Sequence, residues 1–328
     1  MTVTTACGVC GTADVEPLWT AGALDAPERI YTVVRCTACG VARTEPQPSP
    51  AARRARYDAD YGGGALTKLV GPLERLRRAF ARGRARRLAR RLPAGARVLD
   101  VGCGDGKLAV ALLGAGVRAV GLEGSTGPAS RAAAATGGRA VVGDPAALPF
   151  ASSTFDAIVV WHVLEHLPAP KQALAEATRC LRPGGLLVVA VPDVAGVAAR
   201  VGRGAWMGLD VERHLYHFTP ATLADLVAGQ GLVVRRRRHV NLELAVIDLL
   251  DTTLRRIGLG RFGLYQHLAS GARRGATSVA SLVVAAVALP FAFVGALAAG
   301  VAGRGTDVQL WAERPSPRPG GREADGRA

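Results

Sequence analysis

Aromatic residues and negative charge are both scarce in this sequence of 328 residues. Phe, Trp and Tyr make up 5% of it, and 26 Asp and Glu stand against 41 Lys and Arg, which gives a formal net charge of +15. Few aromatics are interleaved with the basic residues, and this disfavours nucleic acid, because base stacking needs aromatic rings. Residues 1–11 lack the charged start and apolar run of a secretory signal, so we expect a cytoplasmic setting.

The positive charge is carried almost entirely by arginine, and much of it falls in one segment that is expected to be helical. That segment contains Arg75, Arg77, Arg78, Arg82, Arg84, Arg86, Arg87, Arg90 and Arg91. A genome rich in G and C favours arginine without any functional reason, so the charge by itself is weak evidence. The segment is either a solvated helix face or a surface that attracts anionic lipid head groups, with nucleic acid as a third reading.

The most informative segment is an apolar strand over residues 98–101 that runs into a glycine-rich turn, with a helix expected to follow. Glycine lets the backbone pass close to a ligand, and a helix N-terminus favours negative charge. Glu123 ends the next apolar strand, where an acid can bind ribose hydroxyls. The glycines are spaced G-x-G-x-G, whereas dinucleotide-binding proteins usually have G-x-G-x-x-G.

Taken in order, these motifs resemble those of the class I S-adenosylmethionine (SAM)-dependent methyltransferases, over about residues 93–240. Residues 155–160 match the fourth strand of that family, and residues 181–185 match the turn into the fifth. The resemblance implies a seven-stranded, doubly wound, Rossmann-like α/β sheet with SAM as cofactor; the alternative is a structural glycine turn in another α/β domain. The cofactor residues that we expect are Asp100, Gly102, Gly104, Gly106, Glu123 (ribose), Asp144 (adenine) and Trp161.

Two C-x-x-C pairs stand near the start of the chain, each followed by glycine: Cys7 with Cys10, and Cys36 with Cys39. Four thiolates suit a tetrahedral structural Zn²⁺, and a short hairpin over about residues 19–34 fits between the pairs. Disulfide bonds are the alternative, which a cytoplasmic setting disfavours.

A zinc ribbon ahead of this domain resembles a bacterial subgroup of methyltransferases in which a Pro-rich link and a tyrosine segment follow. Residues 46–50 match the link, and Tyr57 and Tyr61 match the tyrosine segment. The two tyrosines either fold over the SAM pocket or belong to a solvated linker.

Histidines gather behind the fourth and fifth expected strands, within residues 161–166 and 212–220. Thr219 and Pro220 predict the N-cap and first residue of a helix, which puts the histidines before them in a loop. Ligands of doubly wound sheets bind outside the carboxyl ends of the strands, so both segments are expected to face one cleft. The catalytic candidates are His162, Glu165, His166, His214 and His217.

Two mechanisms fit these residues. In the first, one histidine is the general base for O-methylation. In the second, His162, Glu165, His166 and either His214 or His217 bind a divalent metal that acidifies the acceptor hydroxyl. The second resembles a metal-dependent pattern, E-x-x-E-H plus a later His, except that His162 replaces the first Glu. Any single histidine could also be a loop residue bonded to backbone.

No charged residue occurs over residues 277–303, a length sufficient to cross a bilayer. However, residues 306–313 read as the seventh, antiparallel strand beside a sixth strand over 232–240, so the chain must return to the sheet. Arginines flank both ends, so the positive-inside rule gives no direction. We expect a bent pair of short helices turning near Pro290, which docks on the inner membrane face with the interfacial region 244–268. A buried helix, a dimer contact and a single span are alternatives.

We therefore expect an enzyme that methylates a hydroxyl of a small-molecule, glycan or lipid-linked acceptor near the inner membrane face. A non-catalytic membrane-bound adaptor and a nucleic-acid methyltransferase are the alternatives. The expected segments are a zinc ribbon (1–45), a linker and basic helix (46–92), the SAM-binding core (93–243), a hydrophobic membrane-associating insertion (244–304), the final strand (305–314) and a disordered tail (315–328).

Overall fold

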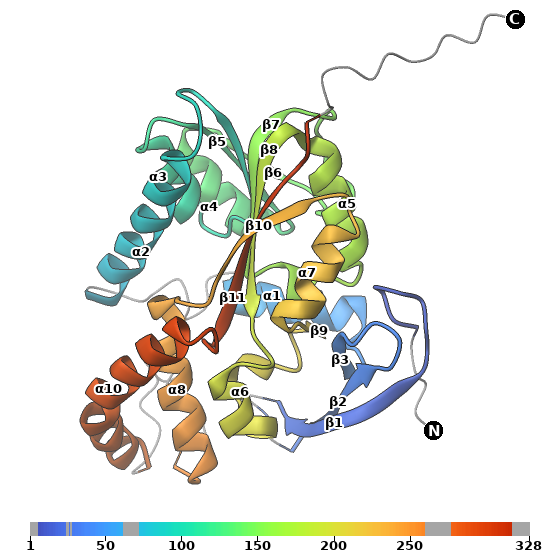
Figure 1. Cartoon of the computed structure of the whole chain (residues 1–328). Helices are drawn as coiled ribbons and strands as arrows, with labels where there is room; N and C mark the ends of the chain where they lie inside the picture. The colour runs from blue at the N-terminus through green and yellow to red at the C-terminus, as the bar shows by residue number, and fades with distance from the viewer. Residues whose placement is uncertain (1–5, 24–25, 27, 62–71, 260–276, 317–328) are drawn as a thin grey trace, which may run out of the picture.

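A computed structural model of the protein describes residues 6–23, 26, 28–61, 72–259 and 277–316. Within these residues the centre of the molecule is a seven-stranded sheet of order β10-β11-β8-β7-β4-β5-β6 (Figure 1). Its strands are β4 (Arg97–Val101), β5 (Arg118–Glu123), β6 (Ala140–Val142), β7 (Phe155–Trp161), β8 (Leu181–Pro192), β10 (Val233–Arg238) and β11 (Asp307–Glu313).

The pairing of the strands confirms the expected doubly wound α/β sheet. Strands β6, β5, β4, β7 and β8 are parallel to one another, whereas β11 runs antiparallel to both β8 and β10. Asp307 lies opposite Pro192 at one end of the β11–β8 ladder, and Glu313 lies opposite Leu186 at the other. The last strand thus returns to the sheet after the hydrophobic segment, as the sequence predicts.

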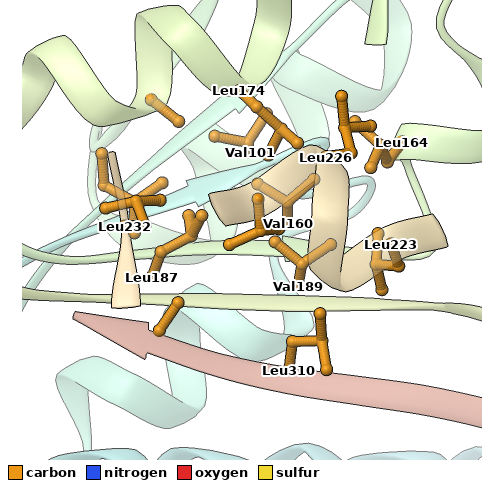
Figure 2. Close-up of a cluster of buried hydrophobic side chains, with 14 of the residues drawn as sticks. Val101, Val160, Leu164, Leu174, Leu187, Val189, Leu223, Leu226, Leu232 and Leu310 are labelled. Atoms are coloured by element: carbon orange, nitrogen blue, oxygen red, sulfur yellow. The ribbon is translucent and has the colours of Figure 1, made fainter. Parts of the chain in front are cut away.

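Helices cover both faces of this sheet, because side chains alternate between faces along each strand. Helices α2 (Pro72–Ala89), α3 (Lys107–Leu113) and α4 (Thr126–Thr136) lie on one side, and α5 (Pro170–Cys180) and α7 (Pro220–Ala228) on the other (Figure 1). Figure 2 shows the core under α5 and α7, where Val101, Val160 and Leu187 from the sheet meet Leu174 and Leu223 from the helices. Each such side chain contributes about 1.5–3 kcal/mol when fully buried.

The chain reverses its direction of winding at β4, which lies between β5 and β7. In open α/β sheets, ligands bind outside the carboxyl ends of the strands at such a switch point. Here β4 leads into the glycine turn, and β7 leads into His162 and the short 3-10 turn η2 (Leu164–His166). The fold therefore brings the predicted cofactor turn and the first group of catalytic candidates to the same edge.

The N-terminal cysteine segment shares a second sheet with the loop that carries two of the histidines. This four-stranded sheet has the order β1 (Val15–Gly22), β2 (Ile30–Cys36), β3 (Ala42–Glu45) and β9 (Tyr216–His217). The predicted hairpin is present as β1 and β2, and helix α1 (Pro50–Tyr61) follows β3. The segment also packs through Val33 and Ala42 on α6 (Val197–Gly202), Trp206 and the turns η3 (Arg203–Ala205) and η4 (Met207–Leu209).

The predicted bent pair of helices near Pro290 is wrong. The segment forms one helix, α10 (Thr277–Val301), with Pro290 inside it, and it lies beside α8 (Leu242–Arg256). Proline removes one helical hydrogen bond, but packing against α8 continues on both sides of it, through Ala288 before and Ala292 after. This two-sided support outweighs the local tendency of proline to end the helix. Of the predicted interfacial region, residues 260–268 lie outside the described residues.

Candidate functional site

The glycine turn after β4 is shaped around the carboxylate of Glu123. The amides of Gly104 and Gly124 donate to its two oxygens, at 2.9 and 2.7 Å. Gly104 has φ +54° and open space where a Cβ would stand, whereas a Cβ on Gly102 would lie 2.3 Å from Cγ2 of Val163. The first glycine therefore allows the turns after β4 and β7 to touch, and Gly104 leaves room beside the turn. Gly106, the N-cap of α3, has φ +77°.

Asp100 is a buried acid directly before this turn. Its side chain is 3% exposed, and Oδ2 has no hydrogen-bond partner among the described residues. Burial, aided by the nearby charge of Glu123, raises the pKa of Asp100 to about 7 against the opposing effect of Arg84. An orphaned carboxylate oxygen beside an open glycine turn fits a cationic ligand group, and SAM carries both an ammonium and a sulfonium.

The other two cofactor candidates lie at the same edge of the sheet but differ in their surroundings. Asp144 follows β6, is exposed, and accepts a hydrogen bond from the Ala146 amide at 2.8 Å. Trp161 ends β7 on the α2 and α3 side, where the guanidinium of Arg84 lies 4.7 Å from the centre of its ring. Arg84 also pairs with Glu243 of α8. Arg84, at least, of the arginines on the basic helix therefore packs against β7. The SAM contacts of Asp144 and Trp161 remain predictions.

His162 stands between two carboxylates at the end of β7. Its Nδ1 lies 3.2 Å from Oε1 of Glu165, and its Nε2 lies 3.5 Å from Oδ2 of Asp307. Burial favours the neutral ring, but Asp307 and Glu165 outweigh it and raise the pKa of His162 to about 10. At neutral pH this histidine is a cation, so of the five candidates it is the least suited to remove a proton. It also has φ +52°, a conformation that costs a non-glycine residue about 1–3 kcal/mol and is common at functional sites.

His166 and His214 face each other across the two loops, with ring centres 4.7 Å apart. Nδ1 of His166 lies 3.0 Å from the carbonyl oxygen of Arg213, and Nδ1 of His214 lies 2.8 Å from that of Gly208. A carbonyl oxygen only accepts, so each Nδ1 carries a proton, and in the neutral ring Nε2 is the nitrogen with the lone pair. Burial, together with His214, lowers the pKa of His166 to about 4, so this ring is neutral at pH 7.

His217 has a different partner, Thr44 on β3. The Thr44 hydroxyl donates to the His214 carbonyl at 2.9 Å and lies 3.0 Å from Nε2 of His217. Because that hydroxyl has one proton to give, Nε2 of His217 must be the donor in the second contact. Burial lowers the pKa of His217 to about 3. His217 therefore links the cysteine segment to the histidine loop, and its catalytic role remains a prediction.

Asp307 and Thr44 belong to this cluster and were missed in the sequence. Both are buried polar residues, at the start of β11 and within β3. Thr44 stands between Arg43 and Glu45, and Asp307 stands between Thr306 and Val308, so nothing in the local sequence marks either one as buried or places it beside the histidines. Tyr57 and Tyr61 lie on α1, and their side chains fall outside the described residues.

The four N-terminal cysteines come together as expected. All six cysteines of the chain are free thiols, which disfavours the disulfide alternative. The Cys7 and Cys39 sulfurs are 3.7 Å apart, and those of Cys10 and Cys36 are 3.5 Å apart. Four sulfurs placed 2.3 Å from a tetrahedral zinc lie about 3.8 Å from each other. Burial raises the pKa of Cys10, but hydrogen bonds with Thr12 and Cys36 outweigh it and lower that pKa to about 6. The set therefore fits Zn²⁺.

The comparison with protein families decides what this fold is. A family model described as a methyltransferase domain matches residues 73–236, half of the chain. The chain belongs to the class I SAM-dependent methyltransferases. The matched segment runs from α2 to β10 and so includes the glycine turn and both histidine loops. The predicted family, and SAM as its cofactor, are confirmed.

Curated relatives match a shorter part of the chain. An uncharacterized methyltransferase from Mycobacterium avium is 43% identical over 99 residues, 29% of this chain and 39% of the relative. A demethylmenaquinone methyltransferase from Renibacterium salmoninarum is 40% identical over 102 residues, 29% of this chain and 41% of the relative. The chain thus spans about two fifths of the length of the curated relatives it matches.

Solved structures cover more of the chain at lower identity. The 1,6-didemethyltoxoflavin-N1-methyltransferase of Burkholderia thailandensis, with S-adenosylhomocysteine bound, covers 87% of this chain and 96% of its own at 17% identity, with a TM-score of 0.48. A SAM-dependent methyltransferase from Archaeoglobus fulgidus covers 79% of this chain and 99% of its own at 16% identity, also with a TM-score of 0.48.

Proposed function

We propose that this protein transfers the methyl group of SAM to a hydroxyl of an apolar or lipid-linked acceptor at the cytoplasmic face of the inner membrane. One observation carries the enzymatic part. At the switch point of the sheet, the cofactor turn with Asp100 and Glu123 lies next to η2, which carries Glu165 and His166. Cofactor residues and proton-transfer groups thus share one edge.

The chemistry that the chain must supply is alignment and proton removal. Methyl transfer displaces the sulfur of SAM in line, so the acceptor oxygen must be held on the far side of the methyl group. Backbone carbonyls hold Nδ1 of His166 and of His214, and one ring nitrogen of each histidine lies within 4.8 Å of a carboxylate oxygen of Glu165. A neutral imidazole held in this way suits removal of a hydroxyl proton at neutral pH.

The membrane part of the proposal rests on one face of α10. Val283–Val301 is the one described segment long and apolar enough to cross a bilayer. Val287, Phe291, Val294 and Val301 are 67, 75, 65 and 77% exposed, and their spacing of three, four or seven residues places them along one stripe. Exposed apolar stripes of this kind mark interaction sites.

Packing of α10 against α8 favours a helix that lies in the interface over one that spans the bilayer. Helix α8 carries Asp248, Asp251 and Arg255, and charged groups at the centre of a bilayer are expensive. Both helices also connect directly to strands at one side of the sheet, α8 to the edge strand β10 and α10 to its neighbour β11. We therefore propose that α10 turns its exposed stripe toward the acyl chains while the sheet stays in water.

Calorimetric titration with SAM and with S-adenosylhomocysteine tests the cofactor site first. We expect saturable binding of both, and a folded protein that binds neither would contradict the enzymatic proposal. Transfer of tritium from methyl-labelled SAM to fractionated membrane lipids then tests the acceptor class. A demethylmenaquinone-type quinone is one pure acceptor to include, in view of the relative that carries that name.

A further inference from the structure

Three side chains beyond the carboxyl end of β7 gather around one point. Glu165, His166 and His214 each place one ligand atom within 4.8 Å of the other two. The first two lie on η2, after β7, and the third lies in the loop before β9. The metal site predicted from the sequence also included His162 and allowed His217 in place of His214. Neither His162 nor His217 is part of the set that the structure brings together.

Glu165 supplies a carboxylate oxygen that has no other use. The residue is 1% exposed, and its Oε2 has no hydrogen-bond partner among the described residues. Its Oε1 is held by Nδ1 of His162 at 3.2 Å, and its backbone carbonyl accepts from the Leu215 amide at 2.8 Å. An unpaired oxygen on a buried carboxylate costs free energy unless a cation or a donor meets it.

Backbone contacts orient His166 and His214 so that one ring nitrogen of each can bind a metal ion. In each, the contact between Nδ1 and a carbonyl oxygen fixes the proton on Nδ1 and leaves Nε2 as the basic nitrogen. Imidazoles that bind metals are typically held in this way, with the second ring nitrogen bonded to a backbone carbonyl or carboxylate. One carboxylate oxygen and two imidazole nitrogens are all acceptors, so a cation can satisfy them together while a hydrogen bond among them cannot.

We propose that Glu165, His166 and His214 bind one divalent transition-metal ion and leave a coordination position for the methyl acceptor. Two imidazoles and a carboxylate suit Zn²⁺, Mn²⁺ or Fe²⁺, and three protein ligands are typical of sites that keep an open position. Tetrahedral ligands 2.0–2.1 Å from zinc lie about 3.4 Å apart, so ligand atoms within 4.8 Å of one another need to close by at most about 1.4 Å on binding. The four thiolates of the N-terminal segment form a separate site that prefers softer ions.

The role of this ion rests on the proposed methyl transfer to a hydroxyl. A cation next to the acceptor lowers the pKa of its hydroxyl. Because His166 and His214 then hold the ion in place of acting as bases, the hydroxyl proton passes to solvent. The acceptor oxygen then forms the new bond to the methyl carbon as the carbon–sulfur bond of SAM breaks. The electron pair of that bond stays on sulfur, and S-adenosylhomocysteine leaves.

Manganese titration tests the site without interference from the thiolates. Mn²⁺ prefers carboxylate and imidazole ligands over thiolates, and the loss of its solution EPR signal counts bound ions. With full-length protein that holds one zinc ion per chain in the four thiolates we expect one Mn²⁺ per chain. Saturation with zinc should instead give two zinc ions per chain and prevent Mn²⁺ binding, because Zn²⁺ binds nitrogen and oxygen ligands more tightly than Mn²⁺. Glu165→Gln and His214→Gln should each weaken Mn²⁺ binding by more than the roughly 10- to 100-fold that loss of an outer partner costs.

His239→Gln is the matched control, because among the described residues His239 is the one histidine outside the two loops, with Nδ1 3.8 Å from Asp193. It should bind Mn²⁺ like the unmodified protein. No Mn²⁺ binding, or equal binding by the unmodified protein and His214→Gln, would overturn the inference. SAM titration of the same samples separates the two proposals: SAM binding and methyl transfer without the ion refute only the metal site, and ion binding without SAM binding refutes only the proposed function.

Discussion

Replacing Phe291 and Val294 together by asparagine should detach the protein from membranes. Both side chains lie on the exposed stripe of α10, at 75 and 65% exposure. Full burial of such a side chain contributes about 1.5–3 kcal/mol, so the two exposed fractions together amount to about 2–4 kcal/mol. This corresponds to a loss of roughly 30- to 700-fold in membrane partitioning, before the added cost of burying two amides. Asparagine has a helix propensity close to that of Phe and Val, so α10 should persist.

Flotation with liposomes of phosphatidylethanolamine and phosphatidylglycerol measures this partitioning. The unmodified protein should rise with the vesicles, and the double variant should stay at the bottom of the gradient. The matched control replaces Val110 of α3 and Val201 of α6 by asparagine, since these valines are 42 and 51% exposed on helices away from α10. The control should float like the unmodified protein.

Equal flotation of the α10 variant and the unmodified protein would refute the reasoning, since the stripe would then contribute nothing to binding. An unmodified protein that stays below the vesicles and elutes as a dimer would also refute it, and would assign the stripe to a contact between two copies.

Three further predictions concern the cofactor turn, the cysteines and a buried acid. Gly104→Val should abolish SAM binding in calorimetry because the valine fills the open space beside the turn. Gly116→Val is the control: Gly116 also has a positive φ and open space but lies in a distant loop, so this variant should bind SAM normally. Cys36→Ser should lower the zinc content by one ion per chain and destabilise β3 and β9; unchanged zinc in metal analysis would exclude the four-thiolate site. Burial raises the pKa of Asp248 to about 7 in the folded protein, whereas the unfolded chain loses this proton near pH 4. Between these two pH values the folded state binds a proton that the unfolded state does not. Thermal stability should therefore rise as pH falls from 8 to 5. Asp248→Asn, whose amide oxygen can still accept from Trp206 while its NH2 donates to the Thr252 hydroxyl, should show a smaller rise; an identical pH profile would contradict this assignment.

Local patterns sufficed for much of the fold. The helix after the glycine turn, the capped start of α7 at Thr219 and the strand over residues 307–313 are each present as predicted. Thr219 and Thr222 exchange hydrogen bonds at 3.1 and 2.9 Å, a capping pattern that depends on neighbours in sequence alone. Pro290 is the counterexample, because packing against α8 rather than local sequence decided that α10 continues through it.

The sequence by itself determined the family, the cofactor turn, the four-cysteine set and the histidines behind the fourth and fifth strands, because each is a short motif whose residues act through local geometry. The tertiary structure decided which groups those histidines contact. It placed Asp307, which follows the hydrophobic helix, against His162, and it placed Thr44 of the cysteine segment against His217. These contacts join residues 145 and 173 positions apart. Charge state and tautomer depend on such neighbours, so only the folded chain sets His162 as a cation and leaves His166 and His214 with lone pairs beside Glu165.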